Sequence, residues 1–471
     1  MAKPSKREKK PNKKPPVHIV FVHLDLGIGG AEQLVLQLAT ASQDLGYKVD
    51  LVTSRCDPDH CFDAVGVGGR LHKSLHVYGR WIPPNILGVA TALMSTIRML
   101  WITLQTILHF QTADVIVMDV LPTSLPLLCK YLPSAATLFY CHFPDKLLLR
   151  DHGGKFKALY RKLLDGLEES TMALSDTLVV NSKFTLQTVQ QHFPSLSQHQ
   201  IGVLYPALDT SKMTQYNQQP KTQQSPIVSL NRFERKKNIG LLIEAYAFLM
   251  KQSNSATPLP PLIIAGGYDT QNVENVEYRG ELGALASKLD VEVDFRLDIS
   301  DSERATLFQT ALCVVYTPNN EHFGIVPLEA MYAGTPVLAV DSGGPKETVL
   351  DRVTGFLRAP TPEAFGKALH DLIRNPQRAT EMGVAGREHV SKTFGPERLD
   401  REWKELVEAT LERGKERRKK EDLPSLVLWM NTGLYVMEIV FVVVAVLFVT
   451  AVLRHFGILA PGQSIVGRDE L

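Results

Sequence analysis

The sequence is poor in cysteine and has no acceptor site for N-linked glycosylation. Its five cysteines are scattered through 471 residues, and an odd, sparse set of this kind does not provide a disulfide framework. No Asn-x-Ser/Thr triplet occurs anywhere, which agrees with a main body that never enters a glycosylating lumen. We therefore expect the main body to lie in a reducing compartment. The cysteines are Cys56, Cys61, Cys129, Cys141 and Cys313.

The chain also lacks an excess of charge of either sign. Lys and Arg number 51 and Asp and Glu 50, so the overall charge gives no reason to expect a nucleic-acid partner. Residues 1–16, however, hold seven Lys or Arg, one Glu and no apolar run, which predicts a disordered basic tail. This tail has no apolar core of a signal peptide, and its lysines and prolines do not suit a mitochondrial transit peptide. It is either a solubilising tail or a segment attracted to anionic lipid headgroups.

One long apolar run is present near the C-terminus. Residues 432–453 contain a single ionisable group, Glu438, and 22 helical residues at about 1.5 Å each span the roughly 30 Å hydrocarbon core of a bilayer. We expect a transmembrane helix over 426–454. Five cations at 415–420 precede it, so the positive-inside rule places the main body in the cytosol and residues 455–471 across the membrane.

The last four residues, RDEL at 468–471, nearly match the lysine-led signal for retention in the endoplasmic reticulum. Arg replaces Lys and four residues can match by chance, so a fortuitous ending is the alternative. The expected topology places this tail in the lumen, where such a signal is recognised. We therefore expect a protein of the endoplasmic reticulum membrane with its main body on the cytosolic face and a short lumenal C-terminus.

The main body alternates strand-like and helix-like segments, which predicts an α/β fold. Its length is enough for two domains with sizeable cores. Buried-strand patterns occur in both halves of the chain, and the polar stretch at 218–226 resembles a linker between them. We expect two Rossmann-like doubly wound domains, 17–205 and 206–400, facing a cleft, with an amphipathic and basic segment at 401–423. The strand-like runs are 17–26, 48–54, 113–120, 136–143 and 176–182, then 226–233, 261–267, 292–297, 313–318 and 336–340.

Residues 86–110 are nearly all apolar apart from Arg98, Gln105 and His109. One interpretation is a long buried helix of the first domain, and the other is a helix that lies on the membrane surface. A true membrane span is disfavoured by Arg98 in its middle.

Glycines follow the first strand in "LGIGGAEQL", where backbone N–H groups of Gly29 and Gly30 can approach an anion at a helix N-terminus. The stretch half-matches the dinucleotide fingerprint, but Glu32 stands where the third glycine belongs. An oxidoreductase is therefore disfavoured. A bound phosphate or sugar and a tight turn without a ligand both remain open.

Two cations and two carboxylates occupy strand-to-helix loops of the second half. Arg232 and Lys237 lie five apart between a strand and a helix, and a planar guanidinium with an ammonium suits a diphosphate. In "NNEHFGIVPLEAMYAGTPV", Glu321 is expected on a loop and Glu329 in the first turn of the following helix. The two carboxylates would then approach one ligand from different directions.

The corner between these two carboxylates has its own features. Gly324 is expected to form the turn, and Pro327 suits the first turn of a helix. The free N–H groups around Ile325 and Val326 offer a second anion site.

These motifs together are similar to those of the retaining glycosyltransferases of family 4, which have the GT-B fold. The resemblance rests on Gly-Gly-Ala-Glu after the first strand, Arg-x4-Lys, and Glu-x7-Glu followed by "GTPV" and "SGGPKE", and it covers about 17–400. Within this family, "YCHFPD", "NSKFT", "NRFERKKN", "AGGYD" and "YTPNNEHFGIVPLEAM" resemble mannosyltransferases of the dolichol pathway. The resemblance implies addition of an α-1,3- and an α-1,6-linked mannose from GDP-mannose to mannosyl-chitobiose-diphosphodolichol.

The resemblance also implies roles for individual residues. Arg232 and Lys237 would bind the diphosphate and stabilise the leaving group, Glu321 would contact the transferred sugar, and Glu329 the ribose hydroxyls. His142 would contact the sugar, although a buried histidine without this role is the alternative. Gly29 and Gly30, matching the family's loop glycines, would close over the donor.

No metal is expected, although "CDPDHC" at 56–61 combines Asp-x-Asp with Cys and His. Expected partners are GDP-mannose, the dolichol-linked acceptor and membrane lipids, with other early mannosyltransferases of the pathway as candidates. Two alternatives remain: a related lipid-directed transferase acting, for example, on phosphatidylinositol, and an inactive transferase-like scaffold.

Overall fold

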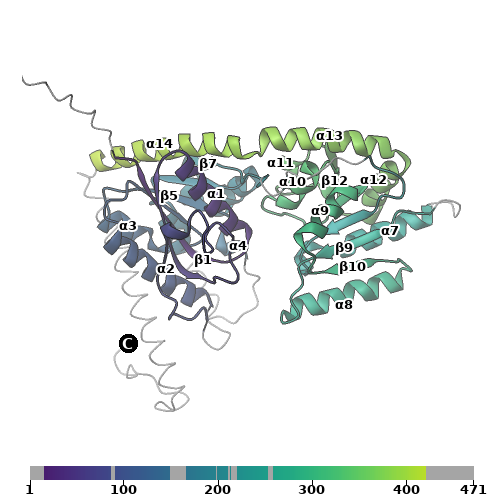
Figure 1. Cartoon of the computed structure of the whole chain (residues 1–471), viewed down its shortest axis with the longest axis horizontal. Helices are drawn as coiled ribbons and strands as arrows, with labels where there is room; N and C mark the ends of the chain where they lie inside the picture. The colour runs from purple at the N-terminus through teal and green to yellow at the C-terminus, as the bar shows by residue number, and fades with distance from the viewer. Residues whose placement is uncertain are drawn as a thin grey trace, which may run out of the picture. The chain divides into compact units, whose positions relative to one another are not determined.

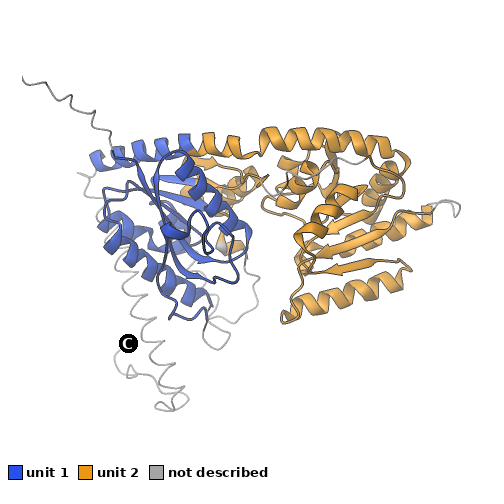
Figure 2. Cartoon of the chain, in the orientation of Figure 1, with its two compact units in different colours: residues 1–140, 149–178, 404–471 blue, residues 141–148, 179–403 orange. Residues whose placement is uncertain are grey.

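The computed structural model describes residues 15–85, 91–148, 166–197, 199–210, 213, 220–252 and 258–420. The expected transmembrane helix, the lumenal tail and nearly all of the basic tail lie outside the described residues. The chain divides into two compact units, which Figure 2 shows in different colours. Unit 1 comprises residues 1–140, 149–178 and 404–471, and unit 2 comprises residues 141–148 and 179–403. The domain limits taken from the sequence stay predictions.

The first sheet has seven strands in the order β3-β2-β1-β4-β5-β6-β7. Strand β1 pairs in parallel with β2 on one side and β4 on the other, so the strand order reverses between β1 and β4. Nearly every residue of β1, β4 and β5 is buried, as expected for parallel strands covered on both faces. The strands are β1 (His18–Leu26), β2 (Lys48–Cys56), β3 (Leu75–Val77), β4 (Val115–Asp119), β5 (Ala136–Cys141), β6 (Thr177–Val180) and β7 (Ile201–Val203).

Helices connect these strands (Figure 1). Helices α1 and α2 pack against β1 and β2, which buries the apolar faces of both helices against the sheet. The helices are α1 (Gly30–Asp44), α2 (Thr91–His109), α3 (Leu125–Tyr131), α4 (Asp145–Leu148) and α6 (Lys183–His192), with short 3₁₀ turns η1 (His72–Ser74), η2 (Pro122–Ser124) and η3 (Pro194–Leu196).

Helix α2 contains the ambiguous apolar segment. It is long and apolar enough to cross a membrane by length and composition alone, and 33% of its apolar stretch is buried inside the structure. Its buried face includes Arg98, whose guanidinium donates to the Asp25 carboxylate of β1 at 2.5 Å. This ion pair fixes α2 to the sheet of unit 1, so the described part of the segment is a covering helix of that sheet.

The second sheet has six strands in the order β10-β9-β8-β11-β12-β13, and every neighbouring pair is parallel. Its order reverses between β8 and β11, as the first sheet reverses between β1 and β4. The strands are β8 (Ile227–Leu230), β9 (Leu262–Gly266), β10 (Asp294–Leu297), β11 (Cys313–Tyr316), β12 (Val337–Val340) and β13 (Gly355–Arg358). The two parallel sheets confirm the expected α/β architecture.

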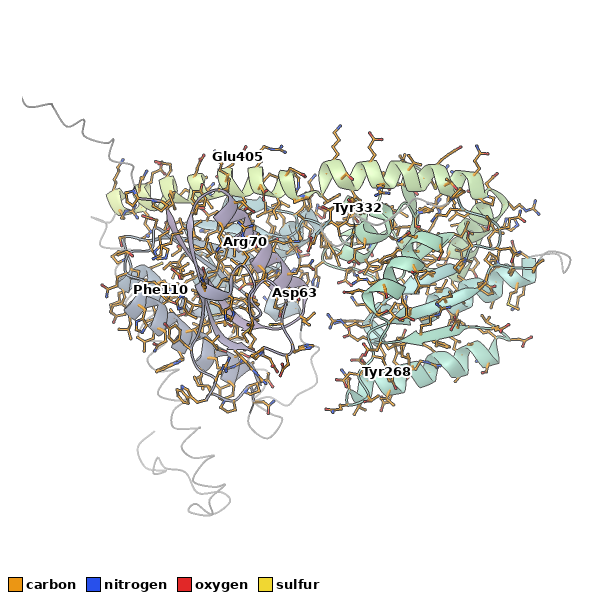
Figure 3. All side chains as sticks on the ribbon, in the orientation of Figure 1. Asp63, Arg70, Phe110, Tyr268, Tyr332 and Glu405 are labelled. Atoms are coloured by element: carbon orange, nitrogen blue, oxygen red, sulfur yellow. The ribbon has the colours of Figure 1, made fainter. Side chains whose placement is uncertain are left out.

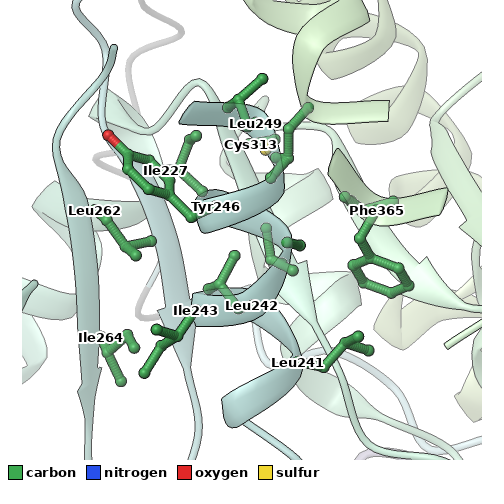
Figure 4. Packing of buried hydrophobic residues seen from close by; sticks show 14 of the residues in the cluster. Ile227, Leu241, Leu242, Ile243, Tyr246, Leu249, Leu262, Ile264, Cys313 and Phe365 are labelled. Carbon is green, nitrogen blue, oxygen red and sulfur yellow. The ribbon is translucent and has the colours of Figure 1, made fainter. Parts of the chain in front are cut away.

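The core of unit 2 forms where helices cover this sheet. Leu242 and Ile243 of helix α7 pack against Ile227 and Ile264 of the sheet. Phe365 of α12 lies on the opposite side of α7 (Figure 4). Side chains fill the interior of each unit (Figure 3). The helices are η5 (Arg235–Lys237), α7 (Gly240–Gln252), α8 (Val273–Lys288), α9 (Asp301–Thr310), α10 (Ile325–Tyr332), α11 (Pro345–Thr348), α12 (Pro362–Arg374) and α13 (Pro376–Thr393).

Helix α14 (Pro396–Lys420) begins before the amphipathic and basic segment expected at 401–423 and runs through its basic part as one continuous helix. Within unit 1, Arg417 donates to Asp176 at 2.8 Å and to the Ala135 carbonyl at 2.9 Å, and Arg418 donates to the Ser134 carbonyl at 2.7 Å. Two cations counted as juxtamembrane charge therefore hold the helix against unit 1.

Candidate functional site

The reversal between β8 and β11 places two loops side by side at the carboxyl edge of the second sheet. Parallel doubly wound sheets bind ligands at this point, because the two connections leave in opposite directions and open a crevice. Arg232 follows β8, and Lys237 ends the short turn η5 in the same loop. Glu321 lies in the loop after β11. The structure therefore brings Lys237 and Glu321 together, although 84 residues separate them in sequence.

Lys237 and Glu321 form an ion pair in which Nζ donates to Oε2 at 2.6 Å. The backbone of this pair is fixed as well, because the Thr317 hydroxyl donates to the Lys237 carbonyl at 2.7 Å. Burial raises the pKa of Glu321, but the charge and hydrogen bond of Lys237 outweigh it, so the net pKa of this carboxyl is lowered. Glu321 is therefore a charged carboxylate near neutral pH.

Arg232 lies in the same loop with a different environment. Its side chain is 67% exposed and its nearest carboxylate is Glu234, at 3.5 Å between Nη1 and Oε1. A weakly paired, solvent-facing guanidinium in the same loop as a largely buried ammonium suits a ligand that arrives from solvent with a diphosphate.

The turn after Glu321 is shaped by Gly324. Its φ of 85° lies in the left-handed region, and a Cβ at this position would meet the Tyr316 ring at 3.3 Å. Tyr316 is buried and its side chain hydrogen-bonds Glu321; burial is the main reason that its pKa is raised, so the hydroxyl stays protonated and donates. Nothing in the sequence indicated this role, because Tyr316 lies inside the apolar strand run 313–318.

The structure corrects the expected position of Glu329. Helix α10 begins at Ile325, so Glu329 is its fifth residue and the first turn holds no acidic residue. The left-handed backbone of Gly324 ends the loop and starts the helix two residues before Pro327. Ile325 and Val326 are the first two helical residues, and the N-cap Gly324 supplies no side chain to their N–H groups.

Glu329 is buried and pairs with a cation that the sequence did not reveal. Its carboxylate accepts a hydrogen bond from Nη2 of Arg304, which lies on α9. Burial is the largest influence on Glu329 and raises its pKa, while Arg304 lowers it in part. No spacing in the sequence relates residues 304 and 329; only the packing of α9 beside α10 brings them together.

The loop 341–344 holds the segment around Glu321 by hydrogen bonds. The Gly344 N–H donates to the Glu321 carbonyl at 2.7 Å. Ser342 accepts from the Asn320 N–H at 3.0 Å and donates to the Asn319 side chain at 2.6 Å. The "SGGPKE" motif thus holds the backbone of the first carboxylate in place.

His142 lies in unit 2 beside a stacked pair of rings. Phe143 stacks on His322 with 3.6 Å between ring centroids and 9° between planes. Burial lowers the pKa of His322 to about 4, and the charges of Lys237, Lys236 and His142 act in the same direction. His322 is therefore a neutral ring between Glu321 and the segment that carries His142.

Comparison with known proteins identifies the family. The family model described as Glycosyltransferase Family 4 matches residues 28–212, and the model described as Glycosyl transferases group 1 matches residues 212–389. The chain is 39% identical over 409 residues to "Alpha-1,3/1,6-mannosyltransferase ALG2" of Homo sapiens, covering 84% of this chain and 96% of the relative. It is 37% identical to the protein of the same name from Schizosaccharomyces pombe, covering 84% and 81%. The chain belongs to the ALG2 family of alpha-1,3/1,6-mannosyltransferases.

A solved structure supports the fold of this ALG2 family member. The sucrose-phosphate synthase of Thermosynechococcus elongatus superposes with a TM-score of 0.65 at 21% identity, covering 83% of this chain and 98% of that one. Together with the two parallel sheets, this likeness confirms the GT-B fold expected from the sequence. The resemblance to family 4 is likewise confirmed by the family models and the ALG2 relatives.

The remaining expected residues of this ALG2 family member lie in unit 1. Gly30 begins α1, and Gly29 is its N-cap with an extended backbone at φ −163°. Neither glycine adopts the left-handed conformation; a Cβ on Gly29 would meet the Glu32 carboxylate, whereas a Cβ on Gly30 would meet no atom within 4 Å. Within the described ranges, no cluster of three or more His, Cys, Asp or Glu side chains is arranged to hold a metal ion, the 56–61 loop included.

Proposed function

We propose that this chain is a retaining mannosyltransferase that uses GDP-mannose as donor. It adds an α-1,3- and an α-1,6-linked mannose to mannosyl-chitobiose-diphosphodolichol. The observation that carries the proposal is the Lys237–Glu321 ion pair beside Arg232, at the point where the second sheet reverses its order. The ALG2 relatives, whose printed names describe an alpha-1,3/1,6-mannosyltransferase, support the choice of sugar and linkages.

The chemistry requires stabilisation of a departing diphosphate. Cleavage of the bond between the anomeric carbon and phosphate places negative charge on the β-phosphate of GDP. Arg232, Lys237 and the uncapped N–H groups of Ile325 and Val326 supply positive potential where this charge develops. Lys237 is held by its ion pair with Glu321, and the two N–H groups are held by helix α10, so these donors stabilise the transition state without reorganising.

Glu321 positions the sugar in this mechanism and is not its nucleophile. A nucleophilic carboxylate needs a free oxygen beneath the anomeric carbon, whereas Glu321 is engaged by Lys237 and Tyr316. We infer that it accepts hydrogen bonds from mannose hydroxyls and that the acceptor attacks from the face that the diphosphate leaves. His142 contacts the sugar, Glu329 the ribose, and Gly29 and Gly30 approach the donor.

We further propose that the acceptor is met at a membrane surface. The outer face of α2 exposes Leu104 by 43% and Leu108 by 57%, and Trp81 nearby is 73% exposed. The Trp81 and Trp101 rings lie edge to face with centroids 5.5 Å apart. Tryptophan and leucine exposed together are typical of protein faces that enter the headgroup region of a bilayer. A transmembrane helix over 426–454 completes the attachment to the endoplasmic reticulum, with the catalytic units in the cytosol and the tail 455–471 in the lumen.

Transfer to a defined acceptor tests the proposal. Purified protein is incubated with GDP-mannose and a synthetic mannosyl-chitobiose lipid diphosphate, and products are resolved by mass. We expect one and two added mannoses, and loss of both in Glu321→Ala and Lys237→Ala. Lys236→Ala is the matched control, because Lys236 is 66% exposed and pairs with Glu234.

Each alternative has its own outcome in this assay. Transfer to phosphatidylinositol and not to the chitobiose lipid would establish a different lipid acceptor. No transfer to either, with GDP still bound, would indicate an inactive scaffold.

A further inference from the structure

Arg304 is the partner of a carboxylate that has little contact with water. The Glu329 side chain is 10% exposed and that of Arg304 is 32% exposed, and Nη2 of Arg304 donates to Oε2 of Glu329. Arg304 lies one turn into α9, whose start is fixed by a capping box between Ser300 and Glu303. The Arg304 guanidinium therefore contacts Glu329 from a helix end whose position is fixed by the capping box.

Of the elements packed against α10, α9 and β11 carry the groups that act on Glu329. From α9, Arg304 favours the ionised carboxylate, and Asp301 disfavours it. From β11, the Tyr316 hydroxyl lies near enough to interact with Glu329 electrostatically, and it remains protonated. Arg304 is thus the cation that counteracts, in part, the effects of burial and of the negative charge of Asp301 on the Glu329 pKa.

A ribose needs an ionised acceptor at this place. Vicinal 2′- and 3′-hydroxyls each donate one hydrogen bond, and a carboxylate offers two oxygens that accept both. A protonated carboxyl has to use one oxygen as a donor, so it matches the diol poorly. An isolated buried carboxylate takes up a proton rather than remain charged.

We propose that Arg304 is a positioning residue that orients the Glu329 carboxylate and balances its charge for the ribose of the donor nucleotide. The inference rests on the proposed function, because that function assigns the ribose to Glu329. Arg304 acts through Glu329 and does not itself touch the donor. Because one of its nitrogens already holds Oε2, the rotation of the carboxylate is fixed before the nucleotide arrives.

GDP affinity across pH tests this role, since it does not require turnover. Calorimetry with GDP at pH 6.5, 7.5 and 8.5 compares wild type with Arg304→Gln, Arg304→Lys and Glu329→Gln. Arg296→Gln is the matched control, because Arg296 precedes α9, pairs with Asp294 and is 40% exposed. We expect Arg304→Gln to weaken GDP binding most at pH 6.5 and to recover as pH rises, with Arg304→Lys retaining most of the affinity.

The expected size follows from the proton equilibrium. Losing an adjacent opposite charge raises a carboxyl pKa by about 1–3 units, and below that pKa the ionised fraction falls about tenfold per pH unit. We therefore expect a loss of about tenfold or more at pH 6.5, shrinking toward pH 8.5. Glu329→Gln should weaken binding without this pH dependence, and Arg304→Gln added to it should cause no further loss. In transfer assays the effect should appear in KM for GDP-mannose and leave kcat nearly unchanged.

Several results would overturn the inference. An Arg304→Gln loss that is equal at all three pH values, or additive with Glu329→Gln, would mean that Arg304 acts only on folding or directly on the nucleotide. Tighter GDP binding by Arg304→Gln would mean that Arg304 competes with the ribose for Glu329. If wild type binds GDP and transfers no mannose, the proposed function fails while the GDP affinities still decide the role of Arg304. If wild type binds no GDP, both fail.

Discussion

Replacing Gly343 by alanine tests whether the loop 341–344 positions Glu321. Gly343 has a φ of +64°, in the left-handed region that alanine adopts with strain. A Cβ on Gly343 would also overlap the backbone carbonyl oxygen and nitrogen of Glu321. Backbone atoms cannot rotate away as a side chain can, so the Glu321 segment itself has to move. We expect Gly343→Ala to reduce both stability and transfer.

The size of the effect has two parts. Left-handed backbone costs a non-glycine residue about 1–2 kcal/mol. Forcing an extra methyl group into packed atoms typically adds about 1–3 kcal/mol. Gly46 separates these parts, because its φ is +80° and a Cβ there meets no atom within 4 Å. Gly46→Ala should therefore show only the backbone cost, and Gly343→Ala should exceed it by about 1–3 kcal/mol.

Denaturant unfolding and transfer kinetics measure the two variants side by side. Gly46→Ala should transfer mannose at the wild-type rate, because it lies in unit 1 at the end of α1. Gly343→Ala should lose about tenfold or more in kcat/KM, since a displacement of about 1 Å at a positioning group costs up to two orders of magnitude. Equal stability and equal activity of the two variants would refute the idea that this loop holds Glu321.

Two further predictions concern stability as a function of pH. The pKa of His322 is lowered from its ordinary value of 6.5 to about 4. Between these two pH values the unfolded chain binds a proton at this histidine and the folded chain does not. Folding stability therefore falls by up to about 3 kcal/mol as pH drops through this window, and His322→Phe, which keeps a ring against Phe143, should remove that share of the slope in acid denaturation. Lys221 has a pKa lowered from 10.5 to about 8 by burial, and its ammonium donates to the Thr335 hydroxyl at 2.7 Å. Between these two values the unfolded chain binds more protons at Lys221 than the folded chain does, so the stability of the wild type should rise relative to that of Lys221→Met as pH increases from 8 to 10. A stability difference between the two proteins that does not change with pH would contradict this.

The elements of the fold were largely predictable because parallel buried strands form continuous apolar runs. Each of the ten expected strand runs overlaps a strand of the structure, whereas the three-residue strands β3 and β7 and the edge strand β13 were missed. Helix α8 has no clear signature in the sequence. Its buried residues Asn275, Tyr278, Leu282 and Ala286 follow helical spacing, but two of them are small or polar, so no apolar stripe marked the helix.

Some residues of the candidate site were also predictable from the sequence, and others were not. Glu321, Lys237 and Arg232 were found because charged residues in short loops after buried strands converge at one sheet edge. Arg304 and Tyr316 were not found, because one lies mid-helix and the other within an apolar strand, and only packing brings them to the carboxylates. The turn at Gly324 was expected from the glycine, but the start of the helix directly after it, at Ile325, was not.

The ion pair of Lys237 with Glu321 links the side chain that we propose binds phosphate to the one that we propose binds the sugar. Both side chains are mostly buried, at 15% and 23% exposure, and the carboxylate already pairs with the ammonium that a diphosphate would bind. The two anions would therefore compete for Lys237. Glu321→Gln removes this competitor and a negative charge near the phosphates, and we expect it to bind GDP more tightly than wild type while losing mannose transfer.

The expected gain and its control follow from the same pair. Exposed ion pairs contribute ~0–1 kcal/mol and this one is better shielded, so the gain should be about three- to tenfold in Kd for GDP. Lys237→Met should weaken GDP binding, and Glu321→Gln should not improve it in that background, because the ammonium it would free is absent. Asp341→Asn is the control, since the Lys346–Asp341 pair at 3.3 Å is 56% and 50% exposed and should leave GDP affinity unchanged. Weaker GDP binding by Glu321→Gln would show that the carboxylate holds Lys237 in place for the diphosphate instead of competing with it.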